Sequence, residues 1–81
     1  MARLKRLTSR EVLKILRRFG FEIVSTRGSH AKLVRETASG ARQVLTVPIH
    51  SELPVGTVRA IYRQASRFID SADLRQEFFS G

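Results

Sequence analysis

The spacing of apolar residues changes twice along this chain, and this change limits the possible folds more than any other feature. Between Leu7 and Gly20, apolar side chains recur every three or four residues, which is the spacing of one helical face. From Phe21 to Val47 the residues are rich in β-branched and apolar types, as in strands. After Gly56 the helical spacing returns. The sequence therefore predicts helices at both ends of a group of strands, in an α+β protein.

The first helical segment carries signals at both of its ends. Thr8, followed three residues later by Glu11, forms a capping box, and Gly20 stands where a C′ glycine ends many helices. The apolar and basic residues fall on opposite sides of this helix. The apolar side holds Val12, Leu13, Ile15, Leu16 and Phe19, and the basic side holds Arg10, Lys14, Arg17 and Arg18. For each single cation, simple exposure to solvent is the first interpretation.

Three short strands are expected next, over residues 21–25, 30–35 and 42–47. Arg27-Gly28 has the composition of one turn, and the stretch from Thr37 to Gly40 that of a second. Pro48 lacks a backbone donor and therefore ends the third strand. Short strands joined by tight turns predict an antiparallel meander.

The C-terminal part predicts two further helices. The second helix starts near Gly56 or Thr57 and runs to about Ile69. A short third helix, capped by Ser71, runs through Phe79. The outer side of the second helix carries a basic stripe of Arg59, Arg63 and Arg67.

The order α-β-β-β-α predicts a three-stranded antiparallel sheet with both helices on one face. This arrangement resembles a double-stranded-RNA-binding domain. The chain has no internal repeat and no long linker, so we expect one domain over residues 1–81, with a short C-terminal helical extension over residues 70–79.

The composition narrows the functional classes. Fifteen lysines and arginines face seven acidic residues, for a net charge of +8, which favours a polyanionic partner such as nucleic acid. The same positive charge would also attract an acidic protein or an anionic membrane surface. The chain has no cysteine, no signal-peptide pattern and no apolar run long enough to span a membrane. A chain of this size buries a small core, so a site is expected in a surface groove or on a flat patch.

Alternation along the second strand separates its two faces. Ala31 and Leu33 belong to the core face, so His30, Lys32 and Val34 should point away from the helices. Val24, Val34 and Val44 are expected to share this open face. A partly apolar and partly basic face suits protein binding, although one exposed face is also ordinary for a small antiparallel sheet.

His30 is the first candidate for catalysis. RNA can be cleaved without a metal when the 2′-hydroxyl attacks the adjacent phosphate, a step that needs a base, an acid and cations. Imidazole titrates near neutral pH and suits the first two roles, and Arg27 and Lys32 supply positive charge. A structural role for a strand histidine remains the simpler alternative on these residues alone.

The second histidine, His50, follows Pro48, and a hydrogen bond within its loop would explain it equally well. A zinc site built on His30 and His50 lacks a third ligand at a suitable spacing. We therefore expect no metal and no cofactor.

Four short stretches, in their order and spacing, resemble one family. They are Gly20-Phe21 at the end of the first helix, Gly28-Ser29-His30, Val47-Pro48-Ile49-His50, and Gly56-Thr57-Val58-Arg59 running on to Gln64-Ala65. Together they resemble the HicA toxins of HicA–HicB toxin–antitoxin systems, over Leu7 to about Phe68.

The resemblance implies an endoribonuclease that cleaves mRNA, an mRNA interferase, in a bacterial or archaeal cytoplasm. It implies that His30, within the glycine–serine–histidine motif, is the catalytic residue. It also implies a HicB-like antitoxin that binds and blocks the toxin.

Several residues are expected to support His30 or to bind RNA. Gly28 allows a positive φ in the turn, and Ser29 either orients the imidazole, contacts phosphate or caps the turn. Thr57 either caps the second helix or lies where free N–H groups meet a phosphate. The remaining candidates are Arg27, Lys32, His50 and Arg59. The alternative function is a non-catalytic module that binds double-stranded RNA through its basic faces.

Overall fold

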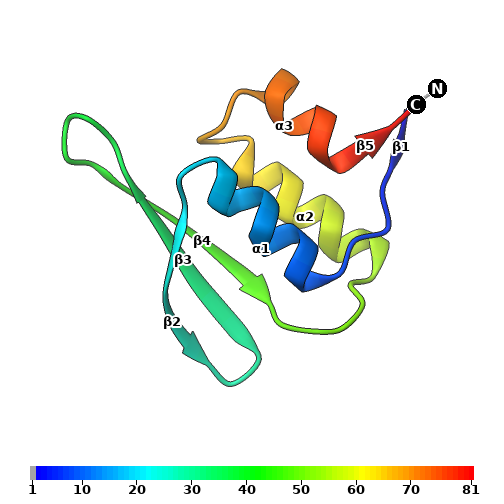
Figure 1. The fold of residues 1–81 in the computed structure, drawn as a ribbon, viewed down its shortest axis with the longest axis horizontal. Helices are drawn as coiled ribbons and strands as arrows, with labels where there is room; N and C mark the ends of the chain where they lie inside the picture. The colour runs from blue at the N-terminus through cyan, green and yellow to red at the C-terminus, as the bar shows by residue number, and fades with distance from the viewer. Residues whose placement is uncertain (1) are drawn as a thin grey trace.

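The structure of the protein, a computed structural model, describes residues 2–81. A three-stranded sheet is covered on one face by two helices, and a third helix packs beside the second (Figure 1). In chain order the elements are β1 (Arg3–Leu4), α1 (Ser9–Arg18), β2 (Glu22–Arg27), β3 (His30–Glu36), β4 (Arg42–Pro48), α2 (Val55–Ala65), α3 (Ser71–Phe78) and β5 (Phe79–Ser80).

The main sheet is the meander that the sequence predicts. Its strand order is β2-β3-β4, and both pairs are antiparallel. Strand β2 runs on through Arg27, so the first turn is Gly28-Ser29 rather than the expected Arg27-Gly28. The expected fold class, α+β with helices on one face of a three-stranded antiparallel sheet and a short C-terminal helix, is confirmed.

Helix α1 has the predicted signals at both ends. The backbone N–H of Glu11 donates to the Thr8 hydroxyl at 3.1 Å, and the N–H of Thr8 donates to the Glu11 carboxylate at 2.9 Å. The chain leaves the helix through Gly20, whose φ of +92° is readily adopted only by glycine.

Helix α2 differs from the prediction at both ends. It starts at Val55 after Pro54, which has no side chain able to cap it, and it ends at Ala65 rather than near Ile69. Thr57 is not the cap, because it lies inside the first turn and its N–H donates to the Pro54 carbonyl at 2.9 Å. Proline suits a helix start because its φ is already helical and no donor is lost there.

Helix α3 starts at Ser71, one residue earlier than a Ser71 cap would give, and ends at Phe78 rather than Phe79. Asp70, not Ser71, accepts the N–H of Ala72 at 2.8 Å. Leu74 and Phe78 are fully buried, so the extension packs on the domain.

A second sheet was not predicted. Strands β1 and β5 pair antiparallel and bring the two ends of the chain together (Figure 1). The N–H of Lys5 adds a bond to the Phe78 carbonyl at 2.8 Å. Strands of two residues leave no periodic pattern, which explains why sequence reasoning missed them.

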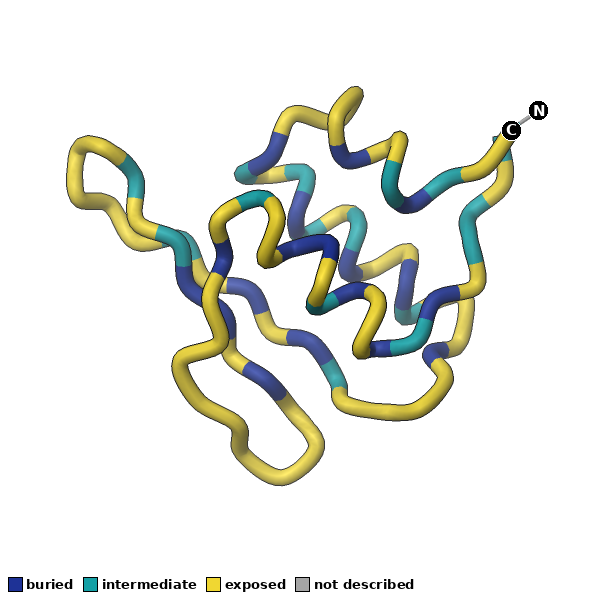
Figure 2. The backbone as a smooth tube through the Cα atoms, in the orientation of Figure 1, coloured by how far each residue is buried: buried dark blue, intermediate teal, exposed yellow. Residues whose placement is uncertain are grey.

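The core lies between the sheet and its helices. The sheet contributes Ala31, Leu33, Leu45 and Val47, and the helices contribute residues such as Val12, Leu16, Val58 and Ile61. Every residue of β2 is exposed, so this edge strand extends beyond the cover of the helices (Figure 2). Within residues 2–81, no helix is long and apolar enough to cross a membrane.

Candidate functional site

The β2–β3 hairpin places His30 on the open face of the sheet. Gly28 has a φ of +58°, with no atom near the position of a Cβ, so the turn needs glycine for its backbone and not for space. His30 follows directly as the first residue of β3 and is exposed. The N–H of Ile49 donates to the Ser29 carbonyl and ties the end of β4 to the same turn.

Two rows of side chains cross the open face beside this turn. Arg27, His30 and Pro48 form one row of cross-strand partners, and Ser25, Lys32 and Thr46 form the next. Cross-strand neighbours have Cβ atoms about 4.5–5.5 Å apart, and rows two residues apart along a strand are separated by roughly 6.5 Å. These spacings are the scale of one phosphodiester group.

A β-bulge in β2 produces this alignment. Ile23 pairs with Leu33, but Ser25, and not Val24, pairs with Lys32. In a regular ladder without the bulge, Val24 would lie opposite Lys32 and Thr26 opposite His30. The bulge therefore brings Arg27 opposite His30 and moves Ser25 onto the open face, a common use of bulges near functional sites.

A groove of about 370 Å³ is formed at these rows. It is lined by Ser25, Arg27, His30, Lys32 and Thr46, all of them exposed. The lining thus combines one imidazole, two cations and two hydroxyls, without a carboxylate. Such a surface suits an anion that also needs proton transfer.

The side chains in this groove are free for a ligand. Among residues 2–81, the side chains of Arg27, His30 and Lys32 make no intramolecular hydrogen bond or salt bridge. Both imidazole nitrogens of His30 are therefore accessible for proton exchange with a bound molecule.

Ser25 and Thr46 are the groove residues that sequence reasoning missed. Thr46 belongs to an ordinary alternating strand, and the face of Ser25 depends on the bulge. A cross-strand register of the hairpin would have found both, but apolar periodicity alone does not define it.

The remaining candidates lie elsewhere. The backbone of His50 is held by Ser9, whose hydroxyl donates to the His50 carbonyl at 2.6 Å and accepts its N–H at 2.9 Å. The hydrogen bond expected for His50 is thus made by its backbone, to the start of α1, and His50 does not line the groove. Thr57 and Arg59 belong to α2, on the opposite side of the sheet from His30.

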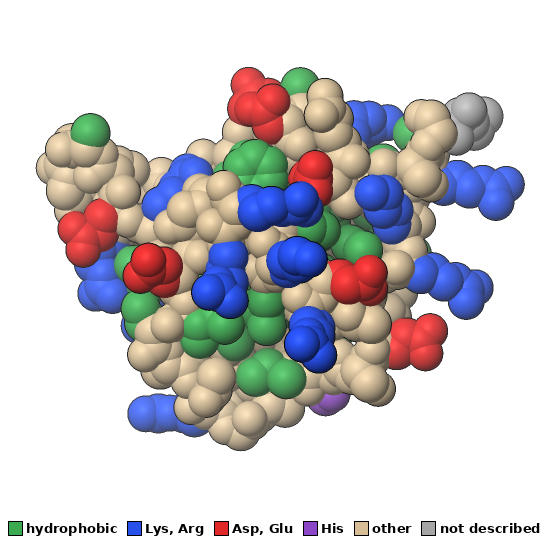
Figure 3. Space-filling view, viewed as in Figure 1, with side chains coloured by type: hydrophobic (Ala, Val, Ile, Leu, Met, Phe, Trp, Pro, Cys, Tyr) green, Lys and Arg blue, Asp and Glu red, His purple; other side chains and the backbone are tan. Residues whose placement is uncertain are grey.

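The charge of the surface is largely unneutralised. Arg18 and Glu77 form the one salt bridge among residues 2–81. Figure 3 shows lysine and arginine side chains spread over the face that carries α1, with acidic side chains between them. Within the same residues, no three His, Asp or Glu side chains gather in a way that could hold a metal ion.

The fold and the groove define a small basic α+β protein with an exposed histidine between two cations on the open face of its sheet. A family model described as the HicA toxin of bacterial toxin–antitoxin systems matches residues 9–66. The chain therefore belongs to the HicA toxin family and is a toxin of a toxin–antitoxin system, which implies an antitoxin as its partner. No curated protein and no solved structure matches the chain.

Proposed function

We propose that this toxin is an endoribonuclease that cleaves mRNA with His30 as its catalytic base and that a HicB-like antitoxin neutralises it. The groove of Ser25, Arg27, His30, Lys32 and Thr46 is the observation that carries the proposal. It places a proton acceptor among cations and hydroxyl donors, on a surface open enough for a polymer.

The reaction begins with the 2′-hydroxyl of the substrate. His30 takes the 2′ proton, the 2′-oxygen bonds to phosphorus, and the bond from phosphorus to the 5′-oxygen breaks. The products are a 2′,3′-cyclic phosphate and a 5′-hydroxyl end. The reaction needs no metal in this scheme, and DNA is not a substrate because it lacks the attacking hydroxyl.

The other groove residues stabilise the phosphorane and the leaving group. Arg27 and Lys32 offset the charge that develops on the non-bridging oxygens, and the hydroxyls of Ser25 and Thr46 donate hydrogen bonds to them. Lys32 is the proton donor that the groove offers to the 5′-oxygen, because His50 lies outside it.

The turn and α2 contribute less directly. Gly28 keeps the hairpin in the conformation that aims His30, and Ser29 lies next to it with its hydroxyl available for phosphate. Thr57 and Arg59 would contact RNA only where it passes beyond the groove to the helix side, so we assign them to affinity rather than to the chemical step.

The experiment is cleavage of a labelled single-stranded RNA, in EDTA, by the wild-type protein and by His30→Ala. General base catalysis contributes roughly 10²–10⁴-fold, so the variant should lose that factor. Circular dichroism should show both proteins folded, since His30 is exposed. Arg63→Ala, an exposed cation of α2, serves as the matched surface control and should cleave normally.

The end group of the cleaved RNA and the activity of the His30→Ala variant distinguish this mechanism from others. A cyclic phosphate on the upstream fragment is expected from 2′-hydroxyl attack. Equal cleavage by a folded His30→Ala variant would falsify the role of His30.

A non-catalytic module for double-stranded RNA is the second candidate, favoured by the fold and by the exposed basic side of α1. It predicts tight duplex binding that weakens steeply with salt, without cleavage by either protein.

A further inference from the structure

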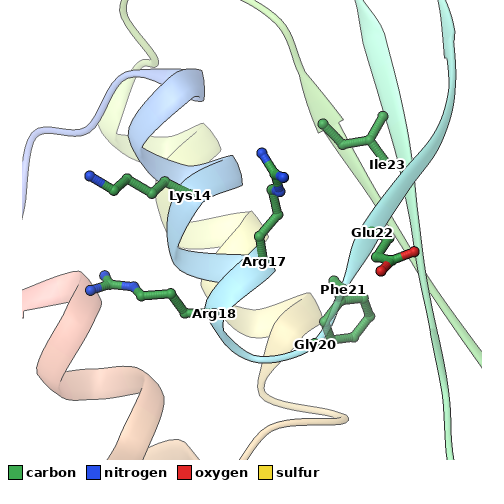
Figure 4. Close-up of a pocket in the computed structure, with 7 residues that line it drawn as sticks. All are labelled: Lys14, Arg17, Arg18, Gly20, Phe21, Glu22 and Ile23. Atoms are coloured by element: carbon green, nitrogen blue, oxygen red, sulfur yellow. The ribbon is translucent and has the colours of Figure 1, made fainter.

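A second surface, distinct from the His30 groove, lies between α1 and the exposed strand β2. A groove of about 670 Å³ is lined on the helix side by Lys14, Arg17 and Arg18 and on the strand side by Phe21, Glu22 and Ile23. Figure 4 shows Arg17 between α1 and β2, on the side of Ile23, while Lys14 and Arg18 extend from α1 away from β2.

Two of the three cations are free to attract an anion. Arg18 is held by Glu77 of α3, whereas Lys14 and Arg17 form no ion pair within residues 2–81. Glu22, across the groove, lies too far from them to form one. The helix side of the groove therefore attracts carboxylates or phosphates.

The strand side offers an unpaired sheet edge. Strand β2 pairs only with β3, so its outer backbone groups have no partner strand in the part of the chain that the structure describes. Its middle residues, Ile23 to Thr26, carry no charge that would oppose an added strand. Exposed edges of this kind recruit extended segments from other chains.

A strand added to β2 would meet different chemistry on its two faces. On the helix side it would face Arg17 and the exposed Ile23. On the open side it would lie beside Val24, which is 53% exposed at the β2 edge, and beside Glu22, the cross-strand partner of the buried Val34. Because successive side chains of a strand point to opposite faces, the matching segment alternates acidic and apolar residues.

The bulge limits how long this pairing can be. It interrupts the regular ladder between Ile23 and Ser25 and bends the strand. A short segment centred on Val24 lies beside Arg17 on one face and Val24 on the other, and it ends before the Glu22 carboxylate, which would repel its acidic residues. A long added strand is therefore not required.

RNA fits this surface less well than a protein does. Single-stranded RNA is held by stacking on aromatic side chains, and Phe21, the one aromatic residue of the groove, is fully buried. The exposed Val24 and a free backbone edge offer a nucleic acid little, but both suit a peptide.

We infer that the antitoxin docks through a short extended segment of alternating acidic and β-branched apolar residues, which adds to the free edge of β2 beside α1. This inference rests on the proposed neutralisation by a protein partner. It assigns that partner an anchoring site apart from the catalytic groove, so that neutralisation and cleavage depend on different residues.

The test uses a capped synthetic octapeptide that alternates glutamate and valine, titrated into the ¹⁵N-labelled protein. Amide shifts should concentrate on β2 and the last turn of α1. A Lys14→Glu/Arg17→Glu variant should bind the peptide about tenfold more weakly, because two attractions become repulsions. An Arg63→Glu/Arg67→Glu variant has the same net charge and should bind within about twofold of wild type.

A second variant tests the edge without changing α1. Val24→Lys places a charge on the exposed β2 edge itself and should also weaken peptide binding, as lysine does on protected edges. Both variants alter exposed residues and should remain folded by circular dichroism.

Three results would overturn the inference. One is the absence of shifts at millimolar peptide, or shifts confined to the His30 groove. Another is equal weakening by both charge-reversal variants, which would show general attraction only. The third is a 2′-O-methyl oligouridylate, which cannot be cleaved, shifting the same amides more strongly than the peptide. Because the titration does not measure cleavage, it can fail while His30-dependent cleavage stands, and the reverse also holds.

Discussion

The two faces of the three-stranded sheet have opposite properties, although the same strands form both. In β3, Ala31 and Leu33 are completely buried under the helices, whereas their neighbours His30 and Lys32 are exposed. The covered face holds the apolar contacts that stabilise the fold. The open face makes few contacts within the protein, so reactive and charged side chains can stand there with little effect on the free energy of unfolding. Stability and chemistry should therefore be separable by single substitutions.

Adjacent residues of β3 provide the sharpest test of this separation. Leu33→Ala should lower the free energy of unfolding by roughly 2–5 kcal/mol, since it removes a fully buried side chain from the core. Lys32→Ala should change it by less than about 0.5 kcal/mol. Urea unfolding followed by circular dichroism measures both. A comparable loss of stability in the two variants would mean that the open face is part of the packed structure.

The same two variants should reverse their order in RNA cleavage. Lys32→Ala should reduce the rate on the order of 100-fold, because it removes a cation beside the reacting phosphate. Leu33→Ala, assayed at a temperature where it remains folded, should cleave at nearly the wild-type rate. Wild-type cleavage by Lys32→Ala would remove Lys32 from the mechanism.

Substitution of Arg35 tests whether a charged side chain on the covered face can also stabilise the fold. Its guanidinium donates to the carbonyls of Phe19 and Phe68 at 2.9 and 2.7 Å and to the Gln43 side chain at 2.8 Å, and it lies 4.8 Å from the centre of the Phe21 ring. Arg35→Met should therefore destabilise the protein by about 2–3 kcal/mol, since these acceptors lose charged donors.

The matched control for Arg35 is Arg42→Met. Arg42 is an exposed arginine of β4 without such hydrogen bonds, so its loss should change unfolding by less than about 0.5 kcal/mol. If both variants unfolded at the same urea concentration, the hydrogen bonds of Arg35 would make no net contribution to the free energy of unfolding.

The smallest effect is expected at the start of α1, away from both faces. Thr8→Ala removes the capping hydroxyl and should lower the free energy of unfolding by about 1 kcal/mol.

Hydrogen bonds from the backbone N–H and hydroxyl of Thr8 lower the pKa of the Glu11 carboxyl. This depressed pKa adds stability above the ordinary glutamate pKa, which is lost as the pH falls through the folded-state value. The free energies of unfolding of the wild-type protein and of Glu11→Gln should therefore approach each other as the pH falls. Urea unfolding at neutral and at acid pH measures both. A constant difference would contradict this linkage.

The fold could be predicted because its signals are local. Thr8 with Glu11, the glycine after α1 and the alternation of Ala31 and Leu33 each depend on a few neighbouring residues. The predicted caps of α2 and α3 were wrong because the local signals there are weak or ambiguous. Asp70 and Ser71 are both good caps, and Pro54 starts α2 without any capping side chain.

Within the candidate site, His30 and the neighbouring cations Arg27 and Lys32 could be predicted from the sequence, whereas Ser25 and Thr46 could not. The motif of His30 and its position at the start of a strand are properties of adjacent residues. Ser25 and Thr46 join it only through pairing between strands, and one extra residue at the bulge decides which side chains lie opposite His30 and Lys32. A shift of one residue exchanges the two faces of a strand, so periodicity alone does not define such a register.

The sequence by itself determined the α+β order, the net charge of +8, the capping of α1 and an exposed histidine after a glycine turn. Tertiary structure alone decided that Arg27 lies opposite His30, that β2 extends beyond its helices, and that both ends of the chain meet in a second sheet. The physical reason is the separation along the chain of the residues that interact. Helix signals and face alternation arise from neighbours in the chain, whereas register, coverage and edge exposure arise from contacts between distant segments, whose energies no single segment contains.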